Sequence, residues 1–137
     1  MTFMDKINPD KFNSVLKTWR IPPIVKKAVS VISDNKGDDI VILKLKGITD
    51  LTDFMVICSG NSQKQNRAIA NDLQRLLKKE FRSAPFGVEG SNYGDWVLLD
   101  YVDFVVHVFS PETRTKFSLE KLWMDAKRYD FIFAEQS

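Results

Sequence analysis

The sequence predicts a single α/β domain with a mixed five-stranded sheet and flanking helices, and three observations support this class. Stripes of apolar residues at helical spacing alternate along the chain with short runs of β-branched residues. The last two of these runs lie close enough together to form an antiparallel hairpin. The length of 137 residues, 44% of them hydrophobic, suits one domain with one core.

The first part of the chain predicts two helices. Asn8-Pro9 is a typical helix start, and apolar residues then recur at helical spacing as far as Trp19. Pro22-Pro23 ends this helix, and a second apolar stripe runs over residues 24–32. Gly37 is expected to cap the second helix at its C-terminal end.

Two strands and a long helix follow. Residues 39–46 and 53–59 read as strands, and the second is apolar on both faces, which is typical of a central strand. Ser62 and Gln65 have the spacing of a capping box, and Ala84-Pro85 stops the helix that they open. The predicted buried stripe of this helix consists of Ile69, Leu73, Leu76, Leu77 and Phe81.

The last part of the chain predicts three more strands and one helix. Residues 86–89, 95–100 and 103–109 are the strands, and the last two form the hairpin. Val102 suits a positive φ poorly, so we expect a longer loop there than two residues. A final helix opens at Ser110-Pro111. Its predicted apolar stripe is Leu119, Leu122, Trp123 and Ala126.

Charge is unevenly distributed, although the net charge is only +2. Residues 85–112 contain no Lys or Arg, but they hold five acidic and six aromatic residues: Glu89, Asp95, Asp100, Asp103, Glu112, Phe86, Tyr93, Trp96, Tyr101, Phe104 and Phe109. Such a surface repels phosphates and attracts a basic partner, and the alternative is two buried strands with acids at their turns. The basic helix at 62–82 either contacts RNA phosphates or is a solvated face.

The residues disfavour catalytic and metal chemistry. A single cysteine, Cys58, excludes an internal disulfide, and a single histidine, His107, argues against a zinc site. Cys58 is expected to be an inert buried thiol, and His107 a packed or surface strand residue rather than a catalyst. Gly60-Asn61-Ser62 has the position of an anion-binding turn, as in nucleotidyltransferases, but no Asp-x-Asp pair follows it to hold metal ions. Asp50 and Asp53 fit a turn better than an acid/base pair. We therefore expect no enzyme activity and no cofactor.

No apolar run is long enough to cross a membrane, and the first ten residues carry charges without an apolar segment. With one cysteine, a reducing compartment, the cytoplasm, is the expected location.

Residues 24–129 resemble the ribosomal silencing factor family, also called the Iojap-like family. The segments that carry the resemblance occur in the family's order: 39–41, 51–62, 87–90, 95–97, 103–109, 111–114 and 119–123. The resemblance implies a nucleotidyltransferase-like fold without the catalytic carboxylates. It also divides the chain into an N-terminal extension with one amphipathic helix (1–23), the silencing domain (24–129) and a C-terminal tail (130–137).

The function that the resemblance implies is translational repression. A member binds the large ribosomal subunit through its protein numbered fourteen, blocks joining of the small subunit, and is a homodimer when free. The family's contact surface corresponds here to Glu89, Gly90, Asp95, Trp96, Asp100, Asp103, Glu120 and Trp123. Trp96 is expected to anchor the interface, and the alternative is a core residue. Two other functions stay open: a nucleotide-binding or nucleotidyltransferase-type enzyme, and an RNA-binding ribosome assembly factor.

The chain departs from the family pattern at four positions. Phe54 and Phe117 stand where the family has Tyr, Ser118 where it has Glu, and Val102 where it has Gly. These changes remove two hydroxyls and one carboxylate, and they place a β-branched residue in the hairpin turn.

Overall fold

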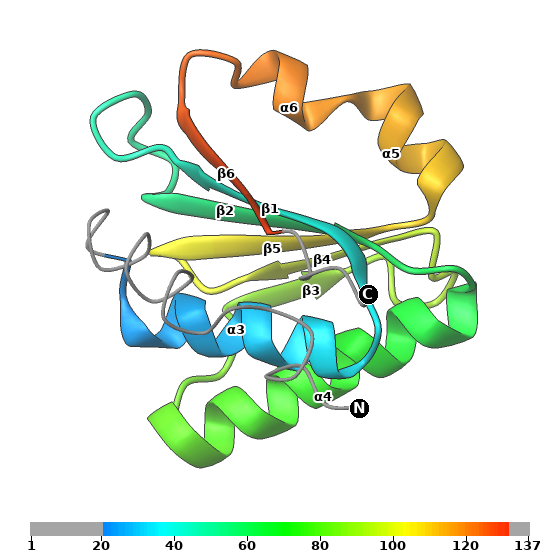
Figure 1. The fold of residues 1–137 in the computed structure, drawn as a ribbon. Coiled ribbons are helices and arrows are strands. Elements are labelled where there is room, and N and C mark those ends of the chain that lie inside the picture. The colour runs from blue at the N-terminus through cyan, green and yellow to red at the C-terminus, as the bar shows by residue number, and fades with distance from the viewer. Residues whose placement is uncertain (1–20, 132–137) are drawn as a thin grey trace, which may run out of the picture.

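The computed structural model describes residues 21–131, which form one mixed sheet between two layers of helices (Figure 1). The helix predicted at 9–19 and most of the predicted C-terminal tail lie outside these residues. The elements in chain order are α3 (Pro23–Asp34), β1 (Asp38–Lys44), β2 (Phe54–Ser59), α4 (Gln63–Phe81), β3 (Gly87–Glu89), β4 (Trp96–Asp100), β5 (Phe104–Phe109), α5 (Pro111–Phe117), α6 (Leu119–Leu122) and β6 (Lys127–Phe131).

The sheet has the strand order β3-β4-β5-β2-β1-β6. Only the central pair of β2 and β5 is parallel, with Phe54 opposite Phe104 and Ser59 opposite Phe109; the other four pairs are antiparallel. All six residues of β2 are buried, which confirms the prediction that this strand is central and covered on both faces.

The helices cover the two faces of the sheet unequally. Helices α3 and α4 lie side by side on one face, and α5 and α6 lie on the other (Figure 1). The larger core cluster fills the space under α3 and α4, and it includes the predicted stripe residues Ile69, Leu73 and Leu77. The smaller cluster lies on the opposite face and is built on Val41, Leu43, Leu45, Met55, Ile57 and Phe109. Strand alternation places Val41 and Leu43 of β1 on this face and Ile40 and Ile42 on the opposite one.

The α/β class is confirmed, but the predicted number of strands is wrong, because the sheet has six. The additional strand, β6, pairs with β1 and lies where the sequence predicts the end of a final helix. Tyr129 and Phe131 alternate with Arg128 and Asp130, and the two aromatic residues belong to the larger core cluster. This period of two is a strand signal, which the helical stripe before it obscured.

The predicted final helix forms only as two short pieces. Ser118 adopts a left-handed conformation with φ 45° between α5 and α6. Its hydroxyl donates to the carbonyl oxygen of Thr115 at 2.6 Å, which stabilises the break. Leu119, Trp123 and Ala126 pack against the smaller core cluster as the stripe predicts, whereas Leu122 is exposed.

The end of α3 uses a different residue from the predicted one. Lys36, with φ 63°, takes the left-handed position that the sequence assigns to Gly37. Gly37 is needed for another reason, since a Cβ atom there would meet Cγ2 of Ile32 at 2.5 Å. Its N–H donates to the carbonyl oxygen of Ile32 at 2.9 Å, so close packing of backbone on α3 requires the glycine.

Candidate protein-binding surface

Strands β3, β4 and β5 carry a part of the sheet that the helices leave uncovered. On the side of α5 and α6, Glu89 lies opposite Leu98, and Asp100 lies opposite Val105. Leu98 and Val105 are half-buried and belong to neither core cluster. We call Glu89, Leu98, Asp100 and Val105 the open face. It presents two apolar side chains, each opposite an acid of a neighbouring strand.

Sequence reasoning missed Leu98 and Val105. The signal was present in the alternation of the two hairpin strands, because Val97, Leu99 and Val106 fill the opposite, buried face. The remaining apolar residues had to point the other way. What the pattern could not show is that no helix covers them.

The β4–β5 loop forms the tip of this surface. The loop is three residues long, which confirms that it is longer than the two residues between the predicted strands. Val102 adopts φ 72° in this loop. The carboxylate of Asp100 accepts from the N–H of Val102 at 2.8 Å. The hydroxyl of Thr52 donates to the carbonyl oxygen of Val102 at 3.0 Å. Val102 is 58% exposed, and Leu51, beside Thr52, is 80% exposed. We call Leu51, Val102 and Asp103 the hairpin tip.

Trp96 lies at the start of β4 and is half-buried beside the open face. Its Nε1–H donates to Nδ1 of His107 at 2.9 Å. Its ring lies 4.8 Å from that of Phe109 and 4.7 Å from that of Phe117, between centroids. Three partners therefore hold the indole in one orientation, with part of its surface open to solvent.

His107 is packed, which is one of the two positions, packed or surface, that the sequence leaves open. It is 5% exposed, and burial lowers its pKa from 6.5 to about 4. Because Nδ1 accepts from Trp96, the ring is neutral and Nε2 carries the proton. Cys58 is likewise confirmed as a buried thiol, and burial raises its pKa to about 12.

The other predicted contact residues are spread over three places. Glu89, Asp100 and Asp103 lie on the open face or the hairpin tip, as described above. Gly90, with φ +82°, sits against the carbonyl oxygen of Trp96, so that a Cβ would collide there. Asp95 accepts from Nε2 of Gln63 at 3.1 Å, which places its carboxylate beside α4 and away from the open face.

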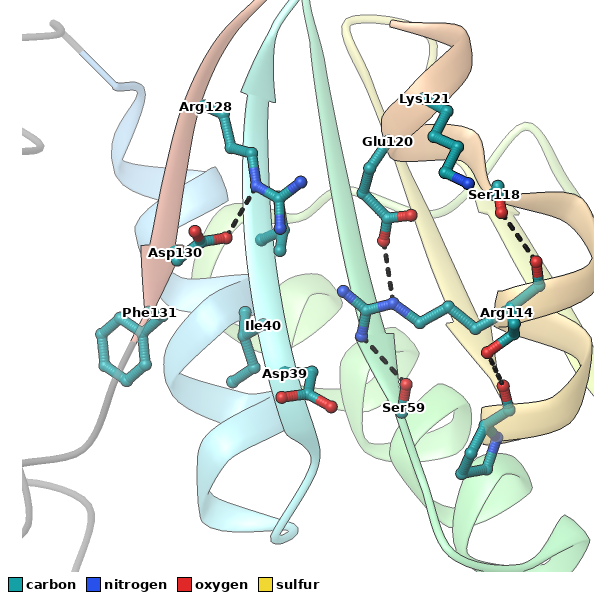
Figure 2. A pocket seen from close by; sticks show the side chains of 13 residues that line it. Asp39, Ile40, Ser59, Arg114, Ser118, Glu120, Lys121, Arg128, Asp130 and Phe131 are labelled. Atoms are coloured by element: carbon teal, nitrogen blue, oxygen red, sulfur yellow. Dashed lines mark hydrogen bonds and ion pairs between the residues drawn. The ribbon is translucent and has the colours of Figure 1, made fainter. Parts of the chain in front are cut away.

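Glu120 and Trp123 lie farther along the same side of the sheet. Trp123 is half-buried against the smaller core cluster. Oε1 of Glu120 accepts from Nε of Arg114 at 2.8 Å, and Nη1 of Arg114 donates to Oγ of Ser59 at 2.9 Å (Figure 2). The Arg114 and Glu120 side chains are only 13% and 15% exposed. This network lines a groove of about 660 Å³ between α5, α6, β1 and β6.

The turn after β2 is occupied by its own side chains. The hydroxyl of Ser62 accepts from the N–H of Gln65 at 3.0 Å, and the side-chain oxygen of Gln65 accepts from the N–H of Asn61 at 2.7 Å. The capping pair therefore forms, with its second bond one residue earlier than the usual box. It uses two N–H groups that an anion would need. Over residues 21–131, no three His, Cys, Asp or Glu side chains are grouped as metal ligands.

None of the helices described in residues 21–131 combines the length and apolar character needed to cross a bilayer.

The chain is similar to proteins named for ribosome silencing and assembly. A family model described as "Ribosomal silencing factor during starvation" matches residues 18–137. A protein of Halalkalibacterium halodurans, "Ribosomal silencing factor RsfS", is 41% identical over 103 residues, 75% of this chain and 87% of that protein. The Mus musculus protein "Mitochondrial assembly of ribosomal large subunit protein 1" is 34% identical over 97 residues, 69% of this chain and 42% of that protein.

The fold agrees with these sequence matches. A crystal structure of a protein from Chromobacterium violaceum superposes with a TM-score of 0.71 at 35% identity, over 83% of this chain and 87% of that one. The resemblance carried by the motifs between residues 39 and 123 is thereby confirmed. The chain belongs to the ribosomal silencing factor family.

Proposed function

We propose that this protein represses translation by binding the large ribosomal subunit and blocking small-subunit joining. The contact is made with the large-subunit protein numbered fourteen, through the open face and the hairpin tip. The observation that carries the proposal is the pair of half-buried apolar residues, Leu98 and Val105, which lie opposite the acids Glu89 and Asp100 of the neighbouring strands. Relatives are named for silencing and for the large subunit, which supports a ribosomal partner.

The physics of the surface suits a basic protein partner. Apolar side chains at the centre of an interface supply most of the binding energy, and charges around them accelerate association. Ribosomal proteins are basic, so Glu89, Asp100 and Asp103 would attract one. A standard interface buries about 1,600 Å², and a domain of this size on the joining face excludes the other subunit sterically. No catalytic step is needed, and we propose that the protein is not an enzyme.

The same surface offers a site for a second copy of the chain. We propose that the free protein is a homodimer in the cytoplasm and that dimerisation and ribosome binding compete for the open face. Leu98 and Val105 would be covered in either state, which removes exposed apolar area from water.

The central test is Leu98→Glu, which places a charge on the open face without touching either core cluster. Binding to isolated protein fourteen should weaken by about 2 kcal/mol or more, roughly 30-fold, and subunit joining in a sucrose gradient should recover. Leu122→Glu, which places the same charge at an exposed apolar site on α6, is the control. If only the Leu122 variant loses binding, the contact surface lies on the final helices around Glu120 and Trp123 instead.

The acids can be tested separately by charge reversal. Glu89→Lys with Asp103→Lys should slow association and weaken its salt dependence. Thermal stability should change little, because neither carboxylate forms an ion pair within residues 21–131. Asp95 and Asp100 are poorer choices, since both accept internal hydrogen bonds. Asp34→Lys with Glu112→Lys changes the net charge equally at other sites and should leave association unaffected.

A further inference from the structure

Helix α4 carries a straight row of basic residues on the face that points away from the sheet. Lys64, Arg67, Arg75 and Lys78 occupy positions i, i+3, i+11 and i+14, and Asn71 fills the gap at i+7. The apolar residues of α4 lie on the opposite side, in the larger core cluster. The row is about 21 Å long at 1.5 Å per residue.

The acids of α4 pair with only one member of this row, Arg75. Asp72 accepts from Nδ2 of Asn35 at 3.0 Å and pairs with Arg75 at 3.2 Å. Glu80 pairs with Lys27 of α3 at 3.1 Å. Within residues 21–131, Lys64, Lys78 and Lys79 have no acidic partner within ion-pair distance. A solvated helix would normally intersperse both signs on its outer face, whereas here the positive charges stand together.

An exposed aromatic ring is held beside this row. The carbonyl oxygen of Tyr93 accepts from Nη1 of Arg67 at 3.4 Å, and the carbonyl oxygen of Gly94 accepts from Nδ2 of the buried Asn66 at 2.7 Å. A Cβ on Gly94 would meet Gln63 and Arg67 at 2.9 Å, so the loop lies directly on α4. Tyr93 itself is 78% exposed. A loop held on α4 thus carries an exposed ring, and the backbone of the same residue contacts Arg67 of the row.

We propose that Lys64, Arg67, Arg75, Lys78 and Tyr93 form a binding site for unpaired RNA. The cations would follow the phosphate backbone, and the ring of Tyr93 would stack on a base. The open face lies on the other side of the sheet, so RNA and a protein partner can be bound together (Figure 1). The source of the RNA rests on the proposed function: ribosomal RNA near the docking site would be the ligand. An acidic protein segment would use the charges but not the ring.

The experiment compares charge-reversed variants of the full chain with a single-stranded RNA of about 12 nucleotides, by fluorescence anisotropy at several salt concentrations. Lys64→Glu with Lys78→Glu should weaken binding at least tenfold and reduce the slope of log K against log salt by about 1.4. Lys46→Glu with Lys127→Glu, two exposed lysines elsewhere, carries the same net charge and should bind like the parent. Tyr93→Ala should lower the affinity for RNA about tenfold, and Tyr93→Phe should leave the affinity unchanged.

Two results would overturn the inference. One is equal RNA binding by the α4 variant and its matched control; the other is equal binding of poly-glutamate and RNA, with no effect of Tyr93→Ala. Binding to isolated protein fourteen distinguishes this failure from failure of the proposed function. The α4 variants should bind protein fourteen normally. The Leu98→Glu variant should no longer bind protein fourteen but should still bind RNA. Thermal melts of every variant identify any that fail to fold.

Discussion

The buried imidazole of His107, hydrogen-bonded to Trp96, should make the protein lose stability as the pH falls below neutral. His107 has a pKa of about 4 in the folded state, against 6.5 for an unperturbed imidazole. Between these values the unfolded chain binds a proton that the folded chain does not, so the free energy of unfolding falls with falling pH. The difference of 2.5 pKa units, at 1.36 kcal/mol per unit, amounts to about 3 kcal/mol once the pH reaches 4.

The geometry explains the direction of this effect. Desolvation disfavours the imidazolium, and a proton on Nδ1 would face the Nε1–H of Trp96 across 2.9 Å. Urea unfolding of the parent and of His107→Gln between pH 7.5 and 4.5 should therefore diverge, because the variant lacks the titrating group. Trp96→Phe removes the N–H donor that opposes a proton on Nδ1 but leaves His107 buried. This variant should therefore cancel only part of the loss of stability at low pH.

The assay has a direct companion, because the chain contains a single histidine. One imidazole resonance in an NMR titration reports the pKa of His107 without assignment ambiguity. The reasoning is refuted if that resonance titrates near 6.5 in the folded protein. It is equally refuted if the parent and His107→Gln lose stability in parallel over this pH range.

Two further predictions concern strain and burial. Val102→Gly should raise stability by about 1 kcal/mol, because a β-branched residue at φ 72° is strained and glycine is not; a lower urea midpoint would contradict this. Val105→Gly, in the extended β5, should destabilise and serves as its control. Arg114→Leu should lower the free energy of unfolding by about 3 kcal/mol, because it leaves Glu120 unpaired. Adding Glu120→Leu should recover most of this stability. A double variant as unstable as the single one would argue against a role for the ion pair.

Much of the fold follows from local patterns, and the failures have identifiable causes. The central strand and the stripe of α4 were predictable because their apolar residues follow one period without interruption. The strand β6 was not, since Leu119, Trp123 and Ala126 keep a helical spacing although Ser118 breaks the helix. A left-handed serine has no local signal as clear as that of a glycine.

The candidate surface was predictable in part for a similar reason. Acids and aromatics in residues 85–112 indicated the strands on which we place the candidate surface, but the direction of each side chain depends on the sheet register. Asp95 and Trp96 are neighbours in sequence and point to opposite sides of the sheet. Whether a helix covers Leu98 and Val105 depends on where α5 and α6 end, which is a property of the tertiary structure.

The single parallel pair of strands has a consequence for the synthesis of this protein. Phe54 pairs with Phe104, so β2 must wait for about 50 residues to be added before its neighbour β5 exists. At roughly 5–20 residues per second this interval is about 3–10 s. During that time only β1 can shield one edge of β2, and the other edge of this six-residue strand, which has five apolar residues, stays open. The nascent chain thus carries its most aggregation-prone segment unprotected until the hairpin of β4 and β5 has left the exit tunnel.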